Sequence, residues 1–345
     1  MSDKVFSKEA WGGTLQGLEK DYRIFVPAKD GDFHSFRRLK EGVIPDFDFF
    51  NTRLSPKGIL YPQSERMFEY TLDENDAEAH ILKETPRDQT NQAIVGIRPC
   101  DARAFQIVQK NFDNPEFRDP WWCANRESTT LVGLGCNDPL STCFCTSVGG
   151  GPFDGAGLDV LLYDLGNRYL ARPLTEKGEA FLEKAPDGTP ADKDTLKEAE
   201  VLKKEASGKI PATLRPDDAA QKPMMELFDA PFWEDVSFPC LNCGTCTYLC
   251  PTCWCFDIQD EVLGKKGERI RNWDSCMFPL FTLHGSGHNP REQKVQRVRQ
   301  RFMHKLKYYV DKYHEGVQCT GCGRCVRFCP GNVDIRQVIE LMCGI

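Results

Sequence analysis

The chain has 345 residues, a net charge of −7 and 17 cysteines. This length is enough for two domains with hydrophobic cores of their own. The negative charge argues against binding to a nucleic-acid backbone, which favours a basic face. No apolar run approaches the roughly 18 residues of a membrane-spanning helix, and the N-terminal residues show no apolar core of a secretory signal. We therefore expect a cytoplasmic protein with no nucleic-acid partner and no transmembrane segment.

The first two thirds of the chain alternate between strand-like and helical patterns. Six runs are rich in β-branched and aromatic residues, which favours strands, namely 21–29, 66–72, 93–99, 129–135, 159–166 and 168–174. Residues 101–112 and 175–186 have the apolar periodicity of helices. The polar segment 183–209 is expected to form a surface helix and loops. We therefore expect an N-terminal α/β domain over residues 1–235.

The pattern changes after residue 236. Residues 289–316 predict a long helix, capped by Asn289 and with Pro290 in its first turn, and residues 334–342 predict another. The basic side chains of the long helix, Arg301 and Lys305 among them, are expected to form a solvated face. We therefore expect a mainly α-helical ferredoxin-like domain over residues 236–345, and an α+β class for the whole chain.

Two cysteine runs in this C-terminal segment have the same spacing, C-x2-C-x2-C-x3-C-P. This run is typical of [4Fe–4S] ferredoxins, in which the fourth cysteine binds the cluster of the other run. Structural zinc would use paired C-x-x-C knuckles, and disulfides would need an oxidising compartment, so neither alternative accounts for the doubled run. The spacing therefore predicts one cluster held by Cys240, Cys243, Cys246 and Cys329, and a second held by Cys319, Cys322, Cys325 and Cys250.

Four more cysteines lie in the N-terminal domain, at Cys100, Cys136, Cys143 and Cys145. Cys100 and Cys136 each follow a predicted strand, and the ends of neighbouring strands can meet in space. Four thiolates brought together in this way would suit a third [4Fe–4S] cluster. The alternative is a set of buried thiols without a metal, since free cysteine is common in protein cores. Cys123, beside two tryptophans, is expected to be a packing residue.

Five segments together resemble the iron–sulfur β-subunit family of cytosolic sulfhydrogenases, which includes the corresponding iron–sulfur subunit of anaerobic sulfite reductase and related 4Fe-4S dicluster domain proteins. They are VGIRPCDARAF, LSTCFCTSVGGGP, CPTCWCFDIQDE, RIRNWDSCMF and CTGCGRCVRFCP, and the resemblance runs from about residue 90 onward. It implies an electron-transfer subunit of anaerobic metabolism. It implies two kinds of partner as well, a flavin-containing NAD(P)H-linked subunit and a catalytic redox subunit of hydrogenase, sulfite reductase or heterodisulfide reductase type. Matching motif cysteines imply a third cluster at Cys100, Cys136, Cys143 and Cys145.

Three cysteines remain, Cys253, Cys255 and Cys276, which match the CPTCWC and WDSC positions of the family. They could pack around the cluster bound by Cys250, or ligate a further site that Cys343 or a histidine completes. They could also build a site at which the chain itself reduces a sulfur compound. No G-x-G-x-x-G follows a predicted strand and no Walker motif occurs, so no dinucleotide site is expected. We therefore expect a non-catalytic iron–sulfur subunit of a hetero-oligomeric cytoplasmic oxidoreductase. The motifs leave the role of residues 1–80 open.

Overall fold

The computed structural model describes residues 2–345, and its larger sheet has eight strands in the order β10-β1-β9-β8-β7-β6-β2-β3. These strands are β1 (Lys4–Ser7), β2 (Arg23–Asp30), β3 (Phe33–Arg38), β6 (Gln92–Ile97), β7 (Thr129–Leu134), β8 (Val160–Asp164), β9 (Arg168–Pro173) and β10 (Thr189–Pro190). Strands β2, β6, β7 and β8 are parallel neighbours, and antiparallel strands flank them on both sides. Every residue of β6 and β7 is buried, as expected where helices cover both faces of a sheet.

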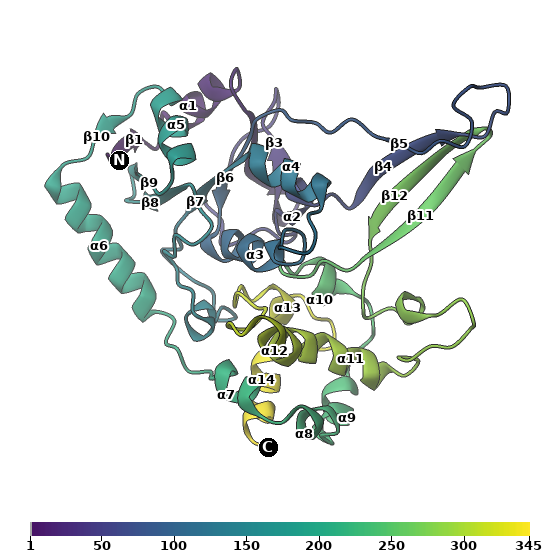
Figure 1. The fold of residues 1–345 in the computed structure, drawn as a ribbon. Helices are drawn as coiled ribbons and strands as arrows, with labels where there is room; N and C mark the ends of the chain where they lie inside the picture. Colours follow the sequence, from purple (N-terminus) through teal and green to yellow (C-terminus); the bar gives the residue numbers. More distant parts are fainter. Residues whose placement is uncertain (1) are drawn as a thin grey trace.

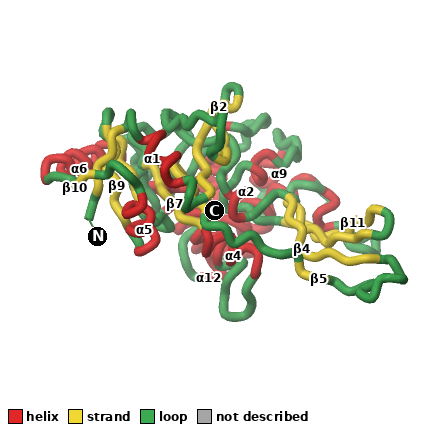
Figure 2. The backbone as a smooth tube through the Cα atoms, turned by 90° about the horizontal axis from the view of Figure 1, so that it is seen from above, coloured by secondary structure: helices red, strands yellow, loops and turns green. Residues whose placement is uncertain are grey.

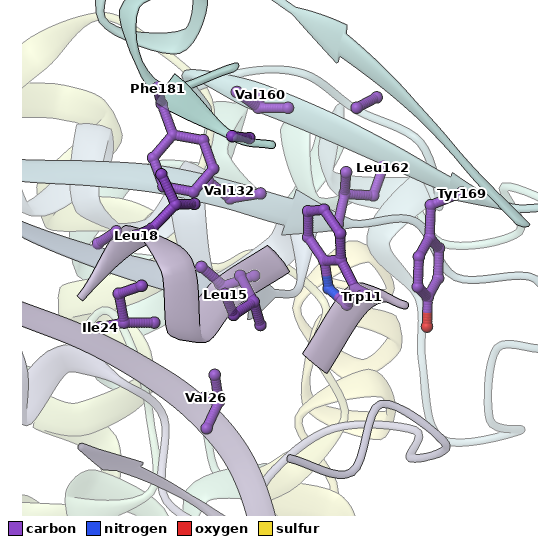
Figure 3. Close-up of a cluster of buried hydrophobic side chains, with 14 of the residues drawn as sticks. Trp11, Leu15, Leu18, Ile24, Val26, Val132, Val160, Leu162, Tyr169 and Phe181 are labelled. Carbon is purple, nitrogen blue, oxygen red and sulfur yellow. The ribbon is translucent and has the colours of Figure 1, made fainter. Parts of the chain in front are cut away.

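Helices pack on the two faces of this sheet (Figure 1). They are α1 (Trp11–Leu18), α3 (Pro99–Gln109), α4 (Pro120–Ser128), α5 (Glu176–Lys184) and α6 (Lys193–Gly208). Figure 3 shows Trp11 and Leu18 of α1, with Phe181 of α5, beside Val132 and Val160 of the strands. Neighbouring strand residues such as Leu131 point to the opposite face, where they join a core cluster with residues of α3 and α6. The predicted strands and helices of this part of the chain are present at nearly the predicted positions.

A second sheet forms an arm that projects from the body (Figure 1), in the order β11-β12-β4-β5. Its strands are β4 (Ser64–Thr71), β5 (Lys83–Glu84), β11 (Phe256–Leu263) and β12 (Lys266–Trp273). Figure 2 shows the same arm from above, extending away from the rest of the chain. Strand β12 pairs with β4, so a C-terminal hairpin is joined to an N-terminal strand. The prediction of a mainly helical C-terminal segment did not include this hairpin, which is exposed along most of β11.

The rest of the C-terminal part is helical and has its own core cluster, which includes Trp233, Phe302 and Ile339. Its helices are α7 (Pro216–Gln221), α8 (Met224–Phe228), α9 (Phe232–Ser237), α10 (Thr245–Tyr248), α11 (Lys294–Met303), α12 (Tyr309–Tyr313), α13 (Arg324–Arg327) and α14 (Ile335–Cys343). The short helix α2 (Lys57–Leu60) comes from the N-terminal part. The predicted domain boundary at residues 235 and 236 falls inside α9. No helix among residues 2–345 has the length and apolar character needed to cross a bilayer.

The long predicted helix begins later than expected. Gln293, and not Asn289, caps α11, through a capping box with Gln296. Asn289 instead closes the preceding loop, where its side chain donates to Pro279 O and accepts from Thr282 Oγ1. Residues 304–308 form a π-helical turn between α11 and α12, so the helix continues to residue 313. Such turns are rare and often mark functional positions.

Candidate iron–sulfur sites

Five cysteines from the two ferredoxin runs line one small space, which we name site A. Four of them, Cys240, Cys243, Cys246 and Cys329, are the set that the spacing predicts for one cluster, and the fifth is Cys325. Val298 and Phe302 of α11 form an apolar wall around it. Cys243 is exposed, so site A lies at the protein surface.

The other four ferredoxin cysteines surround a second space, site B, formed by Cys250, Cys319, Cys322 and Cys325. Cys250, Cys319 and Cys322 are buried. Cys250 therefore faces away from its own run and joins the other one, as Cys329 does in the opposite direction at site A. The structure thus brings together the crossed sets of thiols that the doubled run predicts.

The four N-terminal cysteines, Cys100, Cys136, Cys143 and Cys145, line a third space, which we name site C. Cys100 and Cys136 follow β6 and β7, which are parallel neighbours, so both thiols reach the same edge of the sheet. Cys143 and Cys145 come from the loop that follows. The pocket has a volume of about 680 Å³ and extends to the exposed side chains of Phe33 and Phe50.

Two glycines let the loop of site B pack against the loop of site C. Gly321 and Gly323 have φ of 64° and 73°, in the left-handed region that favours glycine. A Cβ atom at Gly321 would lie 2.5 Å from the backbone of Phe144, and one at Gly323 would lie 2.6 Å from Thr142 Oγ1. The Phe144 N–H donates to Gly321 O at 2.9 Å. A side chain at either glycine would separate the two loops.

The three sites form a row in the order A, B, C. Arg301 and Cys325 line both site A and site B. Cys322 lines both site B and site C, and its carbonyl oxygen lies 3.9 Å from Cys143 Sγ. Neighbouring sites therefore share lining residues, so each site lies directly beside the next.

Buried cations line all three sites without a carboxylate partner among residues 2–345. The exposed fractions of Arg98, Arg301 and Lys305 are 6%, 3% and 3%. Arg98 donates to Leu134 O and Gly135 O, Arg301 to Cys246 O, and Lys305 to Thr252 Oγ1 and Gln318 O. The Nε atoms of Arg98 and Arg301 have no partner. Buried charges of one sign require a compensating charge, and anionic iron–sulfur clusters at the three sites would supply it.

Burial raises the pKa of several of these thiols, which disfavours their thiolate form. Burial raises the pKa of Cys143 to about 11 and of Cys145 to about 12 at site C. It has the same effect at site B, where the pKa of Cys322 is raised to about 11 and that of Cys319 to about 12. Near neutral pH, thiols with such pKa values lose their proton only when a metal displaces it. Four soft sulfur donors beside buried cations therefore fit a [4Fe–4S] cluster at each site.

One buried ion pair connects sites B and C. Arg324 of α13 contacts Asp101 of α3 through two bonds, of 2.6 and 2.8 Å. Both side chains are almost fully buried, with 0% and 1% exposed. Arg324 Nε also donates to Thr52 O at 2.8 Å. These bonds join three segments between the two sites, namely the first turn of α3, the loop around residue 52 and the ferredoxin run.

The buried cations were missed by the sequence analysis, which expected Arg301 and Lys305 on a solvated face. That expectation was wrong, because α11 and the π-helical turn are covered on this side by the cysteine loops. Arg297, Arg301 and Lys305 recur every four residues beside the apolar stripe, and this spacing could have indicated a buried face. Cys123 packs among Trp122 and Phe112, outside the three sites.

Replacing Arg301 with glutamine should make the reduction potentials of the neighbouring sites more negative. Removing a buried positive charge near a cluster disfavours the added electron, by about 1–2 kcal/mol at an effective dielectric constant of about 20. That energy corresponds to a shift on the order of 60 mV for one electron. Redox titration followed by EPR would measure it. Arg299→Gln removes the same charge one half-turn away, where the side chain lies over Phe228, and should leave the potentials unchanged; equal shifts in both variants would contradict the assignment.

Two comparisons with known proteins show what the chain is similar to. Residues 239–333 match the model of the 4Fe-4S dicluster domain. The chain is 29% identical over 333 residues to sulfhydrogenase 2 subunit beta of Pyrococcus furiosus, with 94% of this chain and 93% of that protein covered. Such coverage includes most of residues 1–80, which the sequence motifs left without a match. The resemblance to the iron–sulfur β-subunit family of sulfhydrogenases is therefore confirmed over nearly the whole chain, which carries a 4Fe-4S dicluster domain near its C-terminus.

Proposed function

We propose that the chain relays electrons through three [4Fe–4S] clusters, held at sites A, B and C, within a cytoplasmic hetero-oligomeric oxidoreductase. The observation that carries the proposal is the unbroken row of the three cysteine sets. In this account the α/β part of the chain carries site C, and the ferredoxin-like part carries sites A and B. The similarity to a hydrogenase β-subunit supports an iron–sulfur electron-transfer role.

When bound, each cluster supplies one-electron redox chemistry. The residues of the chain hold the sites close together, exclude water and compensate charge. Arg301 lies between sites A and B, and the pair of Arg324 and Asp101 lies between sites B and C. Backbone N–H groups also point at the thiols, since Gly321 N–H donates to Cys319 Sγ at 3.4 Å and Val333 N–H donates to Cys329 Sγ at 3.2 Å. Such hydrogen bonds tune cluster potentials.

The row has two accessible ends, which suits a relay between two partners. At one end Cys243 is exposed beside Leu241, 69% of which is exposed, and Phe238, 83% of which is exposed. At the other end the pocket of site C reaches the surface at Phe50. We propose that a flavin-containing, NAD(P)H-linked subunit docks at one end and a catalytic redox subunit docks at the other.

The isolated, iron-loaded chain should therefore pass electrons between dyes without turning over any substrate. Reduced by dithionite, it should be reoxidised by a viologen or a quinone dye. It should show no turnover with NAD(P)H, sulfite or hydrogen, because no site for hydride transfer or terminal reduction is assigned to it. Stopped-flow absorbance would follow the relay, with iron-free chain as the control. Substrate-dependent turnover by the lone chain would contradict the proposal, and would favour reduction of a sulfur compound by the chain itself.

A further inference from the structure

Three cysteines outside sites A, B and C gather beside site B, at the base of the arm. Cys253 and Cys255 lie between Cys250 and the start of β11, and Cys276 lies just after β12. The two strands pair antiparallel, with Phe256 opposite Trp273. The pairing continues one step further, where the Asp274 N–H donates to Cys255 O at 2.9 Å. The hairpin therefore brings two thiols together that are 21 residues apart in the sequence.

The sulfurs of this region form two pairs. The side chains of Cys255 and Cys276 interact closely enough to shift each other's pKa, and Cys255 packs against the core cluster that contains Cys276. Cys253 interacts in the same way with Cys250, which belongs to site B. Cys250 serves site B, and the three remaining thiols are one fewer than a [4Fe–4S] cluster takes, so Cys255 and Cys276 are left as a pair of neighbouring thiols.

A buried lysine lies beside this pair. Only 5% of Lys57 is exposed, and its Nζ donates to Cys253 O at 2.9 Å and Thr247 O at 3.4 Å. The same Nζ lies 4.1 Å from the centre of the Trp273 ring. No carboxylate among residues 2–345 pairs with it. Lys57 interacts electrostatically with the side chains of Cys253, Cys250 and Cys255 and with the like charge of Lys305, so this lysine lies among the sulfurs of the region.

The pKa values of Cys255, Cys276 and Lys57 are consistent with a thiol pair beside a buried lysine. The hydrogen bond from Cys276 lowers the pKa of Cys255 to about 7, and the same bond raises the pKa of Cys276. Burial lowers the pKa of Lys57 to about 8. A thiolate next to a thiol is the state from which disulfide exchange and oxidation begin.

We propose that Cys255 and Cys276 form a redox-active dithiol–disulfide pair, a two-electron site that branches from the row at site B. Oxidation of the thiolate–thiol pair forms one S–S bond and releases one proton to solvent and two electrons; the fully protonated dithiol releases two protons. Oxidised [4Fe–4S] clusters of the row accept these electrons one at a time, and reduced clusters return them when the bond is broken. The inference rests on the proposed function, because the clusters are the electron acceptors and donors.

Such a pair would connect one-electron and two-electron chemistry within the chain. Each cluster holds a single electron, whereas a dithiol exchanges two. Cys253 interacts both with Cys250 of site B and with Cys276 of the pair. The sulfurs of the pair are therefore placed next to one cluster of the row and away from both of its ends.

The number of electrons that the full, iron-loaded chain accepts tests the proposal. After mild oxidation with thionine and removal of the dye, an anaerobic titration with dithionite should require about two more electrons per chain for the unaltered protein than for Cys255→Ser or Cys276→Ser. Cys123→Ser, at a buried cysteine away from the row, should behave like the unaltered protein. Equal uptake in all four proteins would overturn the proposal.

Iron analysis of the same samples separates this proposal from the proposed function. About eight irons per chain would remove the third cluster from the account, but the difference of two electrons between the proteins would still identify the pair. About sixteen irons, with a loss of about four in Cys276→Ser, would overturn the proposal by showing that these thiolates bind a fourth cluster.

Thiol mapping of the unaltered chain gives a second readout that does not depend on the folding of variants. The oxidised protein is denatured in iodoacetamide with an iron chelator, digested and analysed by mass spectrometry. The peptides of Cys255 and Cys276 should be cross-linked and unalkylated, and both cysteines should be alkylated after reduction. Complete alkylation of both cysteines in the two redox states would overturn the proposal.

Discussion

Replacing Arg324 with methionine should lower the free energy of unfolding by about 3–5 kcal/mol, the usual effect of removing one partner of a buried ion pair. The substitution leaves Asp101 charged in a place where 1% of its side chain is exposed. It also removes the bonds to Thr52 that hold the N-terminal loop on the ferredoxin run. Urea unfolding under anaerobic conditions, followed by tryptophan fluorescence, would measure the change.

Two further variants show whether burial is the cause. Arg168→Met breaks a surface pair with Glu198, whose side chains are 34% and 46% exposed, and should cost no more than about 1 kcal/mol. The double variant Arg324→Met with Asp101→Asn leaves no buried charge and should recover part of the lost stability. If Arg324→Met were as mild as Arg168→Met, the buried pair would not hold the two parts of the chain together.

Replacing Cys136 with alanine should remove one cluster and interrupt the relay at site C. A [4Fe–4S] cluster takes four thiolates, and Cys136→Ala leaves three at site C, one after β6 and two on the loop that follows β7. We expect a loss of about four of about twelve irons per chain. Sites A and B should keep their EPR signals, because their thiols come from the ferredoxin runs.

The matched control is Cys123→Ala, which removes a thiol that is buried among aromatic side chains and faces none of the three sites. It should leave the iron content and the dye relay unchanged. An unchanged iron content in Cys136→Ala would mean that site C is a set of structural thiols, the alternative that the sequence leaves open.

Local patterns predict thiol sets whose members line the three spaces of the structure. The doubled ferredoxin run encodes its crossed pairing in its spacing, and the buried strands β6 and β7 are each followed within three residues by a cysteine. Because parallel neighbours present the same ends at one edge of a sheet, Cys100 and Cys136 had to lie close together once the strands were adjacent.

Contacts between distant segments could not be predicted in this way. Strand β12 pairs with β4, with Arg269 opposite Phe68, and neither strand indicates its partner by local composition. Lys57 reaches Cys253 across 196 residues of sequence. The neighbouring positions of Cys255 and Cys276 depend on the register of a hairpin that is largely exposed, so no buried apolar face fixes it in the sequence. The burial of Arg301 depends likewise on loops that pack onto α11 from elsewhere.

The content of iron and acid-labile sulfide per chain tests the central claim most directly. The full chain would be purified anaerobically, reconstituted with iron and sulfide, and freed of unbound metal before analysis. Three [4Fe–4S] clusters predict about twelve irons and about twelve sulfides. About eight of each would contradict a cluster at site C and leave a two-cluster chain, and zinc in place of iron would contradict the electron-transfer account altogether.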